Sequence, residues 1–167
     1  MPPPDFRAPR SADDDLASEL NARIDGWNAA TGLRFVRATI DEVVAEITIA
    51  DHHRMPYGVV HGGVYCGIIE TVASVGAALH ALMHGRAAVG LENATAFLHA
   101  VREGMLRVRA TPVSRGKRTH VWSAEVTDDA GRVVATGRVR MMILEADAQL
   151  GGETVGLRPS SAQSDDG

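Results

Sequence analysis

The sequence contains a single cysteine, Cys66, among 167 residues. One thiol excludes an intramolecular disulfide and is typical of a reducing compartment, so we expect a cytoplasmic protein. The N-terminal stretch MPPPDFRAPRSADDD also lacks the apolar run of a secretory signal peptide. The formal net charge of −4 excludes a general attraction to nucleic acid or to anionic membranes, so neither is expected as a partner.

Metal-binding spacings are missing as well. His52 and His53 are adjacent and point in different directions, and no Cys-x-x-Cys or His-Glu-x-x-His pattern accompanies them, so no metal site is expected. One apolar run, residues 62–84, is long enough to span a membrane. Because it contains a glutamate and two histidines, the run favours a buried core helix over a membrane span.

Apolar periodicity predicts the elements of the fold. Helical spacing covers 15–29 and 62–84, and two-residue alternation covers 33–40, 43–50, 87–101, 104–113, 118–127 and 132–144. A helix that is apolar on nearly all sides must be covered on most of them. The pattern therefore predicts an α+β fold, with an antiparallel sheet of five or six strands wrapped around one long central helix. A single domain is expected over 14–146, between disordered tails at 1–13 and 147–167.

The head of the long helix carries His61-Gly62-Gly63. The first N–H groups of a helix have no partner within the helix, and the helix dipole makes this end favourable for negative charge. Glycines also let a ligand approach the backbone closely, so a developing oxyanion could be held here. The alternative is that the two glycines only permit a sharp turn or tight packing.

Glu70 is the one carboxylate within the apolar run and lies nine residues after His61. Nine residues correspond to roughly 12–14 Å along a helix and place the two side chains on opposite sides. They could act on the same atom only across the two-fold axis of a dimer. The alternative is a buried structural carboxylate that is bound to an arginine or to Ser74, one turn further along the helix.

The stretch VVHGGVYCGIIETVAS, together with VGLENATAFLHAVREG and PVSRGKRTHVWSAEVTDDAGRVVATGRV, resembles hotdog-fold acyl-CoA thioesterases. The similarity runs over about 32–144 and points to the branch with Glu on the central helix. This branch includes 4-hydroxybenzoyl-CoA, 1,4-dihydroxy-2-naphthoyl-CoA and phenylacetate-degradation thioesterases. The resemblance implies that Glu70 is the nucleophile or general base and that the N–H of Gly62 polarises the thioester carbonyl, with His61 beside it. It also implies that Ser74 orients Glu70 or its water.

One position departs from the pattern of this branch. Fifteen residues before the glutamate, these enzymes commonly carry a Gln that helps to hold the thioester carbonyl, and this chain has Met55. A thioether cannot donate a hydrogen bond. Either His52, His53 or His61 substitutes for the Gln, or activity is lower, or the natural substrate differs.

The segment SRGKRTH is expected to hold the phosphates of CoA, because its cations flank a glycine in a turn between two strands. A solvated basic hairpin is the alternative. By the resemblance, the substrate-binding and CoA-binding residues are Met55, Gly90, Phe97, Leu98, His99, Ala100, Ser114, Arg115, Gly116, Lys117, Arg118 and Thr119.

The sequence thus predicts an acyl-CoA thioesterase that forms a homodimer or a homotetramer built as a dimer of dimers, with each site across a dimer interface. It should need no metal or redox cofactor, because a thioester is already activated and CoA is part of the substrate. Two alternatives stay open: a non-catalytic acyl-CoA-binding module, which Met55 favours, and a thioesterase that acts on an acyl carrier protein.

Overall fold

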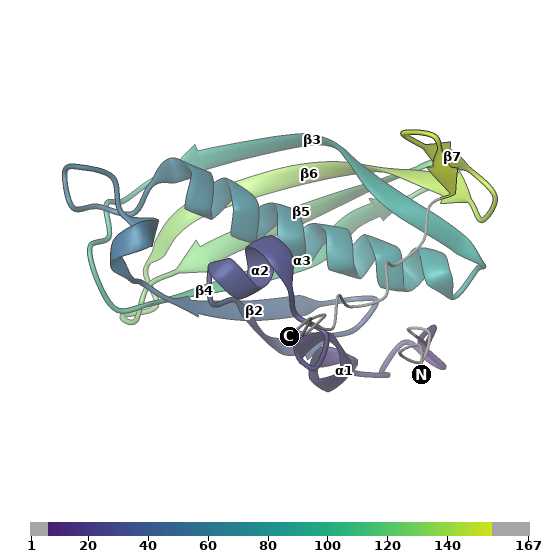
Figure 1. The fold of residues 1–167 in the computed structure, drawn as a ribbon, viewed down its shortest axis with the longest axis horizontal. Coiled ribbons are helices and arrows are strands. Elements are labelled where there is room, and N and C mark those ends of the chain that lie inside the picture. Colours follow the sequence, from purple (N-terminus) through teal and green to yellow (C-terminus); the bar gives the residue numbers. More distant parts are fainter. Residues whose placement is uncertain (1–6, 155–167) are drawn as a thin grey trace, which may run out of the picture.

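The protein is described here by a computed structural model that covers residues 7–154. Six strands form one antiparallel sheet, in the order β1-β2-β4-β5-β6-β3, which curves around a long helix (Figure 1). The predicted α+β architecture is therefore confirmed. The bounds are α1 Ala17–Asn21, α2 Gly26–Ala30, β1 Arg34–Ala38, β2 Val43–Thr48, η1 Asp51–His53, α3 Gly62–Leu82, β3 Arg86–Phe97, β4 Met105–Arg115, β5 Thr119–Thr127, β6 Val133–Glu145, β7 Gln149–Leu150 and β8 Glu153–Thr154.

The inner face of the sheet follows the predicted alternation. In β5, the side chains of His120, Trp122, Ala124 and Val126 are buried, and the residues between them are exposed or half-buried. Successive side chains of a strand point to opposite faces, so the buried set of β5 lies on the face toward the core. Neighbouring strands contribute matching sets, and together these residues form the hydrophobic core around α3.

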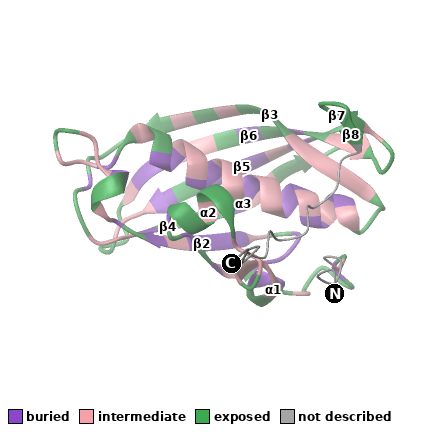
Figure 2. Cartoon of the chain, viewed as in Figure 1, coloured by how far each residue is buried: buried purple, intermediate pink, exposed green. Residues whose placement is uncertain are grey.

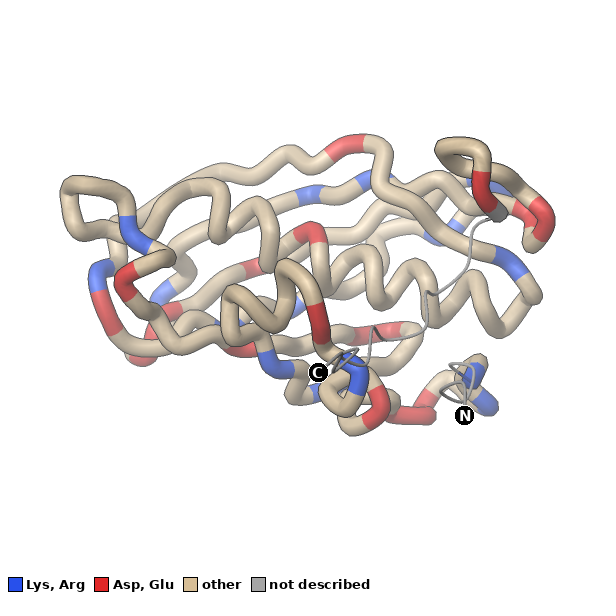
Figure 3. Tube along the Cα trace, viewed as in Figure 1, with Lys and Arg blue, Asp and Glu red and all other residues tan. Residues whose placement is uncertain are grey.

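The central helix α3 carries no Lys or Arg, and Glu70 is its one acidic residue (Figure 3). By length and composition it could cross a membrane, but it is the core helix of the fold and packs on the concave face of the sheet. Gly76 allows this packing, because a Cβ there would stand 2.3 Å from the indole of Trp122. The helix is followed by Gly85 with φ +65°, as expected of a glycine that closes a helix.

The N-terminal helix was predicted wrongly as one element over 15–29. The chain forms two short helices, α1 and α2, because Asp25 has an extended backbone and Gly26, which begins α2, has a left-handed φ of +51°, so one continuous helix cannot pass through them. Asn21, the last residue of α1, forms two hydrogen bonds with the backbone of β1. Its side-chain amide donates to the carbonyl of Phe35 at 2.8 Å and accepts from the N–H of Phe35 at 2.9 Å. Trp27 consequently lies half-exposed on α3 above Gly67.

The described chain extends past the predicted boundaries of 14 and 146. Arg7 pairs with Asp14 and with Glu19 of α1, and β7 and β8 form a short hairpin at 149–154. These segments have local structure where we expected tails. The remaining parts of the predicted tails, 1–6 and 155–167, lie outside the described residues.

Strand β3 forms an edge of the sheet. It pairs along its length with β6, and within residues 7–154 its other edge has no partner strand. Its residues are exposed or half-buried, whereas β4 and β5 carry alternating buried residues (Figure 2). The pairing shifts register between Gly90 and Glu92, which makes an irregularity in the middle of this edge. A free edge of twelve residues is a ready template for pairing with another chain.

Candidate active site

Glu70 points from the middle of α3 toward β3, and each of its carboxylate oxygens accepts one hydrogen bond. Ser74 donates its hydroxyl to Oε1 at 3.0 Å, as the i,i+4 spacing predicted. Asn93 of β3 donates its side-chain amide to Oε2 at 3.2 Å. The two contacts hold the carboxylate in one orientation. The structure thus brings together Glu70 and Ser74, which the sequence placed in one site.

Asn93 is a site residue that the sequence analysis missed. Its amide also donates to the backbone carbonyl of Cys66 at 3.0 Å, and its own carbonyl accepts from Thr95 at 2.6 Å. The contact with the carbonyl of Cys66, which can only accept, assigns the amide orientation, so that the NH₂ group faces Glu70. An amide side chain within a strand expected to pack on the central helix was the available signal. The irregularity at 90–92 decides which face Asn93 occupies, and periodicity does not reveal it.

Gly90 contacts the same carboxylate from β3. A Cβ at this position would stand 2.5 Å from Oε1 of Glu70, so no larger residue fits without moving the carboxylate. The resemblance implied a CoA contact for Gly90. In this chain its immediate neighbour is Glu70, and its missing side chain leaves room for that carboxylate.

The head of α3 forms the second half of the predicted site. His61 is the N-cap, and its Nδ1 accepts from the N–H of Gly63 at 2.8 Å. The neutral imidazole therefore carries its proton on Nε2. The N–H of Gly62 has no acceptor among the described residues, as the first N–H of a helix typically lacks one. The head thus offers a backbone donor and a ring N–H at an exposed end of the helix.

Phe97 covers this helix head. Its ring carbons would lie 2.8–2.9 Å from a Cβ at Gly62, and its ring centroid is 5.9 Å from that of Tyr65. The glycine at position 62 therefore leaves room for an aromatic ring. Phe97 itself is 55% exposed and begins the exposed segment that was predicted to contact CoA, Phe97, Leu98, His99 and Ala100.

Met55 lies in the turn that leads into α3. Its N–H donates to the carbonyl of Val59, and its carbonyl accepts from Gly58. Of the three histidines that could replace the family Gln, His53 is excluded. It is buried, its Nδ1 accepts from the N–H of Ala50 and its Nε2 contacts the carbonyl of Thr31, so both ring nitrogens are used. Burial and the neighbouring His52 lower the pKa of His53.

The SRGKRTH segment forms the end of β4, a tight turn and the start of β5. Arg115 is not a free cation, since it donates to the carbonyl of Ile40 at 3.0 Å and to the carboxylate of Asp41 at 2.6 Å. In the described part of the chain, Lys117 and Arg118 have no acidic partner and are exposed. Two of the three expected cations are therefore available to an anion. The other turn residues that were predicted to bind CoA are exposed as well: Ser114, Gly116 and Thr119.

Glu70 and Gly62 cannot meet within one chain. Eight residues of a straight helix separate them, which corresponds to about 12 Å along its axis. Each has its own neighbour on β3, Gly90 beside Glu70 and Phe97 beside Gly62. One chain therefore presents an oriented carboxylate and a separate oxyanion-type donor. Residues 7–154 contain no cluster of side chains suited to a metal ion.

Comparison with known proteins places this arrangement in a family. The thioesterase superfamily model matches residues 57–135, a range that includes the helix head, Glu70 and the basic turn. A Mycobacterium tuberculosis protein that is named as an esterase is 37% identical to this chain over 148 residues. The aligned region covers 87% of this chain and 98% of the M. tuberculosis protein. The chain belongs to the thioesterase superfamily. It is a thioester hydrolase, and its fold is the hotdog fold that the resemblance implied.

Solved structures of similar proteins agree with this fold. The structure of the same M. tuberculosis protein superimposes on this chain with a TM-score of 0.71 at 38% identity. The match covers 73% of this chain and 98% of the M. tuberculosis chain. AziG from S. sahachiroi has the same TM-score and identity, covering 74% and 99%. A thioesterase variant from Pseudomonas aeruginosa has a TM-score of 0.74 and covers 83% and 99%; at 24% identity it supports the fold alone.

Proposed function

We propose that this thioesterase hydrolyses an acyl-CoA thioester to a carboxylate and free CoA, with Glu70 as the attacking or proton-accepting group. The observation that carries the proposal is the environment of Glu70. Ser74 and Asn93 each hold one carboxylate oxygen, and Gly90 leaves the space beside it open. A carboxylate held in one orientation from two sides is prepared to act on a substrate, because it need not reorganise during the reaction.

The chemistry needs only a carboxylate and an oxyanion donor. As a general base, Glu70 takes a proton from water while the oxygen attacks the thioester carbon. The C–S bond then breaks, and the thiolate of CoA takes up the proton. As a nucleophile, Glu70 forms a mixed anhydride that water hydrolyses. In both routes the carbonyl oxygen becomes negative in the transition state, and the free N–H of Gly62 is the group proposed to stabilise it.

A two-fold axis through β3 would bring the two halves of the site together. Gly90 touches Glu70 and Phe97 touches Gly62, so the two halves contact β3 on either side of Asn93 and Ala94. If β3 pairs antiparallel with its copy about an axis near these two residues, the Phe97 end of one strand lies beside the Gly90 end of the other. Gly62 of one protomer then approaches Glu70 of the other. The free edge of β3 favours this pairing.

Coenzyme A as the carrier is supported by the exposed Lys117 and Arg118, which have no acidic partner in the described chain. An acyl carrier protein would offer the same thioester on an acidic surface. A thiol-release assay that compares acyl-CoA esters with the same acyl groups on a carrier protein distinguishes them. We expect turnover of CoA esters that depends little on salt, whereas a carrier-protein substrate would give a strong salt dependence.

The catalytic role is tested with Glu70→Gln, which keeps the shape of the side chain. Across a panel of aryl- and alkyl-CoA esters we expect a loss of kcat on the order of a thousandfold or more, with unchanged folding by circular dichroism. Glu103→Gln, at an exposed loop position, is the matched control and should retain full activity. Comparable activity in the two variants would refute the assignment of Glu70.

The shared site is tested by cross-linking. Ala94 is exposed at the free edge of β3, so in a Cys66→Ser background Ala94→Cys should form a disulfide with its own copy. Val113→Cys, an exposed position on β4, should not. Mixing inactive Glu70→Ala with inactive Gly62→Pro should restore part of the activity. Heterodimers without any recovery would contradict the two-fold geometry.

A further inference from the structure

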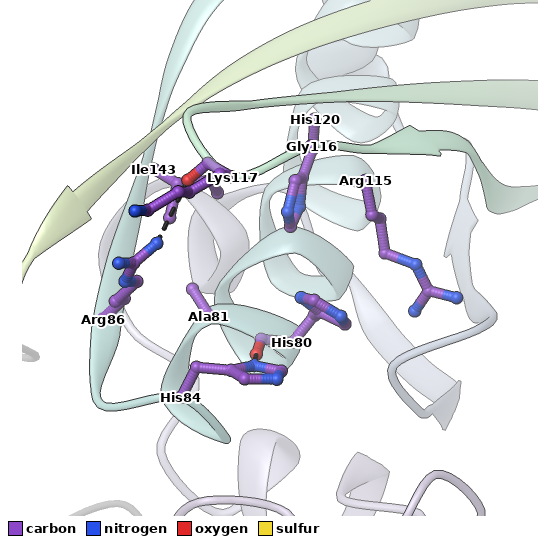
Figure 4. A pocket seen from close by; sticks show the side chains of 9 residues that line it. All are labelled: His80, Ala81, His84, Arg86, Arg115, Gly116, Lys117, His120 and Ile143. Atoms are coloured by element: carbon purple, nitrogen blue, oxygen red, sulfur yellow. Dashed lines mark hydrogen bonds between the residues drawn. The ribbon is translucent and has the colours of Figure 1, made fainter.

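A cavity of about 470 Å³ opens at the far end of α3 from the helix head (Figure 4). Its wall is formed by the last turns of α3, the start of β3, the turn between β4 and β5, and the facing parts of β5 and β6. Neither Glu70 nor Gly62 lines it. Its volume lies in the range of small-molecule sites.

Three imidazoles gather in this cavity. His80 lies in the last turn of α3 and His84 in the turn that follows the helix, with ring centroids 4.8 Å apart, and the ring of His120 from β5 lies 5.0 Å from that of His80. Figure 4 shows the ring of His120 pointing from its strand toward His80. His120 is 2% exposed, and its Nδ1 has no hydrogen-bond partner among the described residues. A buried polar atom normally has a hydrogen-bond partner. A bound group could therefore supply the partner that Nδ1 of His120 lacks among the described residues.

The charged groups that face the imidazoles are cationic. Arg86 from β3, Arg115 from the end of β4 and Lys117 from the turn all line the cavity. The acids nearby are engaged at its rim, where Asp41 pairs with Arg115 and Glu145 pairs with Arg86. Each of these pairs is close to neutral, which leaves Lys117 as the uncompensated cation among the described residues that line the cavity.

We propose that this cavity is a binding site for a tetrahedral dianion, the phosphate group of a phosphorylated small molecule, held by Lys117, Arg86 and the ring N–H groups of the three histidines. Phosphate has several acceptor oxygens, and this wall offers donors and cations to meet them. The carboxylates near the wall already accept from Arg86 and Arg115, so they do not oppose the ligand. Where that phosphate belongs to CoA, the inference rests on the proposed function; where it belongs to a free molecule, it does not.

Binding is coupled to proton uptake. Burial, the neighbouring imidazoles and Arg115 lower the pKa of His120 and of His80, so both rings are neutral near pH 7 in the empty cavity. A dianion beside the rings raises the pKa of His120 and of His80 again, because an opposite charge favours the imidazolium form. His84 contacts the carbonyl of His80 at the end of α3, which holds its ring at the cavity wall. The site should therefore bind a dianion more tightly as the pH falls.

Sulfate is the sharpest probe, because its charge stays at −2 across the range in which histidines titrate. We expect sulfate to shift the NMR signals of the Cε1–H groups of His80, His84 and His120, and to leave those of His52 and His99 unchanged. Sulfate affinity should be roughly tenfold higher at about pH 5.5 than at about pH 7.5, and inorganic phosphate should produce the same shifts. Equal shifts of the three cavity histidines and of His52 and His99 would overturn the proposal. So would the absence of any shift at the three cavity histidines.

Two exposed positions supply variants that should fold normally, Lys117→Ala and His84→Gln. Each should weaken sulfate binding by about tenfold, since Lys117→Ala removes a cation and its donors, and His84→Gln replaces a ring that can become cationic by a neutral amide. Arg138→Ala, which removes an exposed cation of β6 outside the cavity, is the matched control and should bind sulfate normally. Full affinity in both cavity variants would contradict the assignment.

The source of the phosphate is resolved by competition. If CoA places its phosphates here, CoA displaces sulfate and gives the same histidine shifts. If a free phosphorylated molecule is the ligand, the sulfate shifts persist when CoA is saturating. The readout does not involve turnover, so Glu70→Gln should bind sulfate like the wild type. Failure of the catalytic proposal would then leave this result standing, and failure of sulfate binding would leave the catalytic proposal standing.

Discussion

Gly90 of the edge strand lies directly against Glu70 of the central helix, so that a Cβ on the glycine would stand 2.5 Å from Oε1 of the carboxylate. Atoms that are not bonded do not approach so closely, and a side chain at position 90 must therefore displace Glu70. The relationship joins the proposed catalytic group to β3, whose other edge has no partner strand within residues 7–154. Position 90 consequently controls where the carboxylate points.

Gly90→Ala should lower kcat by about a hundredfold with a smaller change in KM, because a displacement on the order of 1 Å is enough to misplace a reacting group. The measurement is steady-state thioester hydrolysis, with circular dichroism to verify folding. In a Glu70→Gln background the same substitution should cause no further loss, since the group that it displaces is already inactive. Additive losses in the double variant would show that Gly90 acts on something other than Glu70.

Asn93→Ala and Ser74→Ala should each lower kcat about tenfold, because each removes one hydrogen bond to a charged carboxylate. Asn93→Asp should be worse than Asn93→Ala, since it places a second negative charge beside Glu70. Thr95→Val, which acts only through the orientation of Asn93, should have a milder effect. If Asn93→Asp were the most active of the four, the amide of Asn93 would not be a donor to Glu70.

Met55→Gln should raise kcat/KM about tenfold or more, because it supplies a donor for the thioester carbonyl where the thioether has none. The turn around Met55 is held by its own backbone bonds, so the substitution should leave the loop in place. Met83→Gln, at the exposed end of α3, is the control and should be neutral. An unchanged or reduced rate would indicate that His61 already supplies this donor, or that the natural substrate does not need it.

The free energy of unfolding should fall as the pH is lowered from 6.5 toward 4. The folded state lowers the pKa of His120 from 6.5 to about 4, so within this window the unfolded chain binds the proton more readily. Stability is therefore highest above the window, and His120 contributes at most about 3 kcal/mol to the loss across it. Chemical denaturation at a series of pH values measures the slope, which His120→Gln should reduce. If the slope were unchanged in this variant, other groups would cause the pH dependence.

Much of the fold and part of the site followed from local pattern. Alternation predicted the buried set of β5, and the apolar run predicted α3, because the periods of strands and helices reflect which side chains face the core. The pairing of Ser74 with Glu70 followed from one helical turn, a spacing that helix geometry determines. The position of Glu70 relative to Gly62 on α3 followed in the same way, so the sequence alone excluded that these two groups of one chain act on the same atom.

Only the tertiary structure decided which side chains from distant parts of the chain come into contact. Asn93 reaches Glu70 because β3 crosses α3 with an irregularity at 90–92, and no local period encodes that register. His120 meets His80 because the end of a helix packs against a strand forty residues later. Arg115 is not available to an anion at the basic turn, because it forms an ion pair with Asp41 of another loop. The sequence by itself determined the elements and the spacing within each, since these depend on neighbours along the chain, whereas the contacts between elements depend on how the sheet folds around the helix.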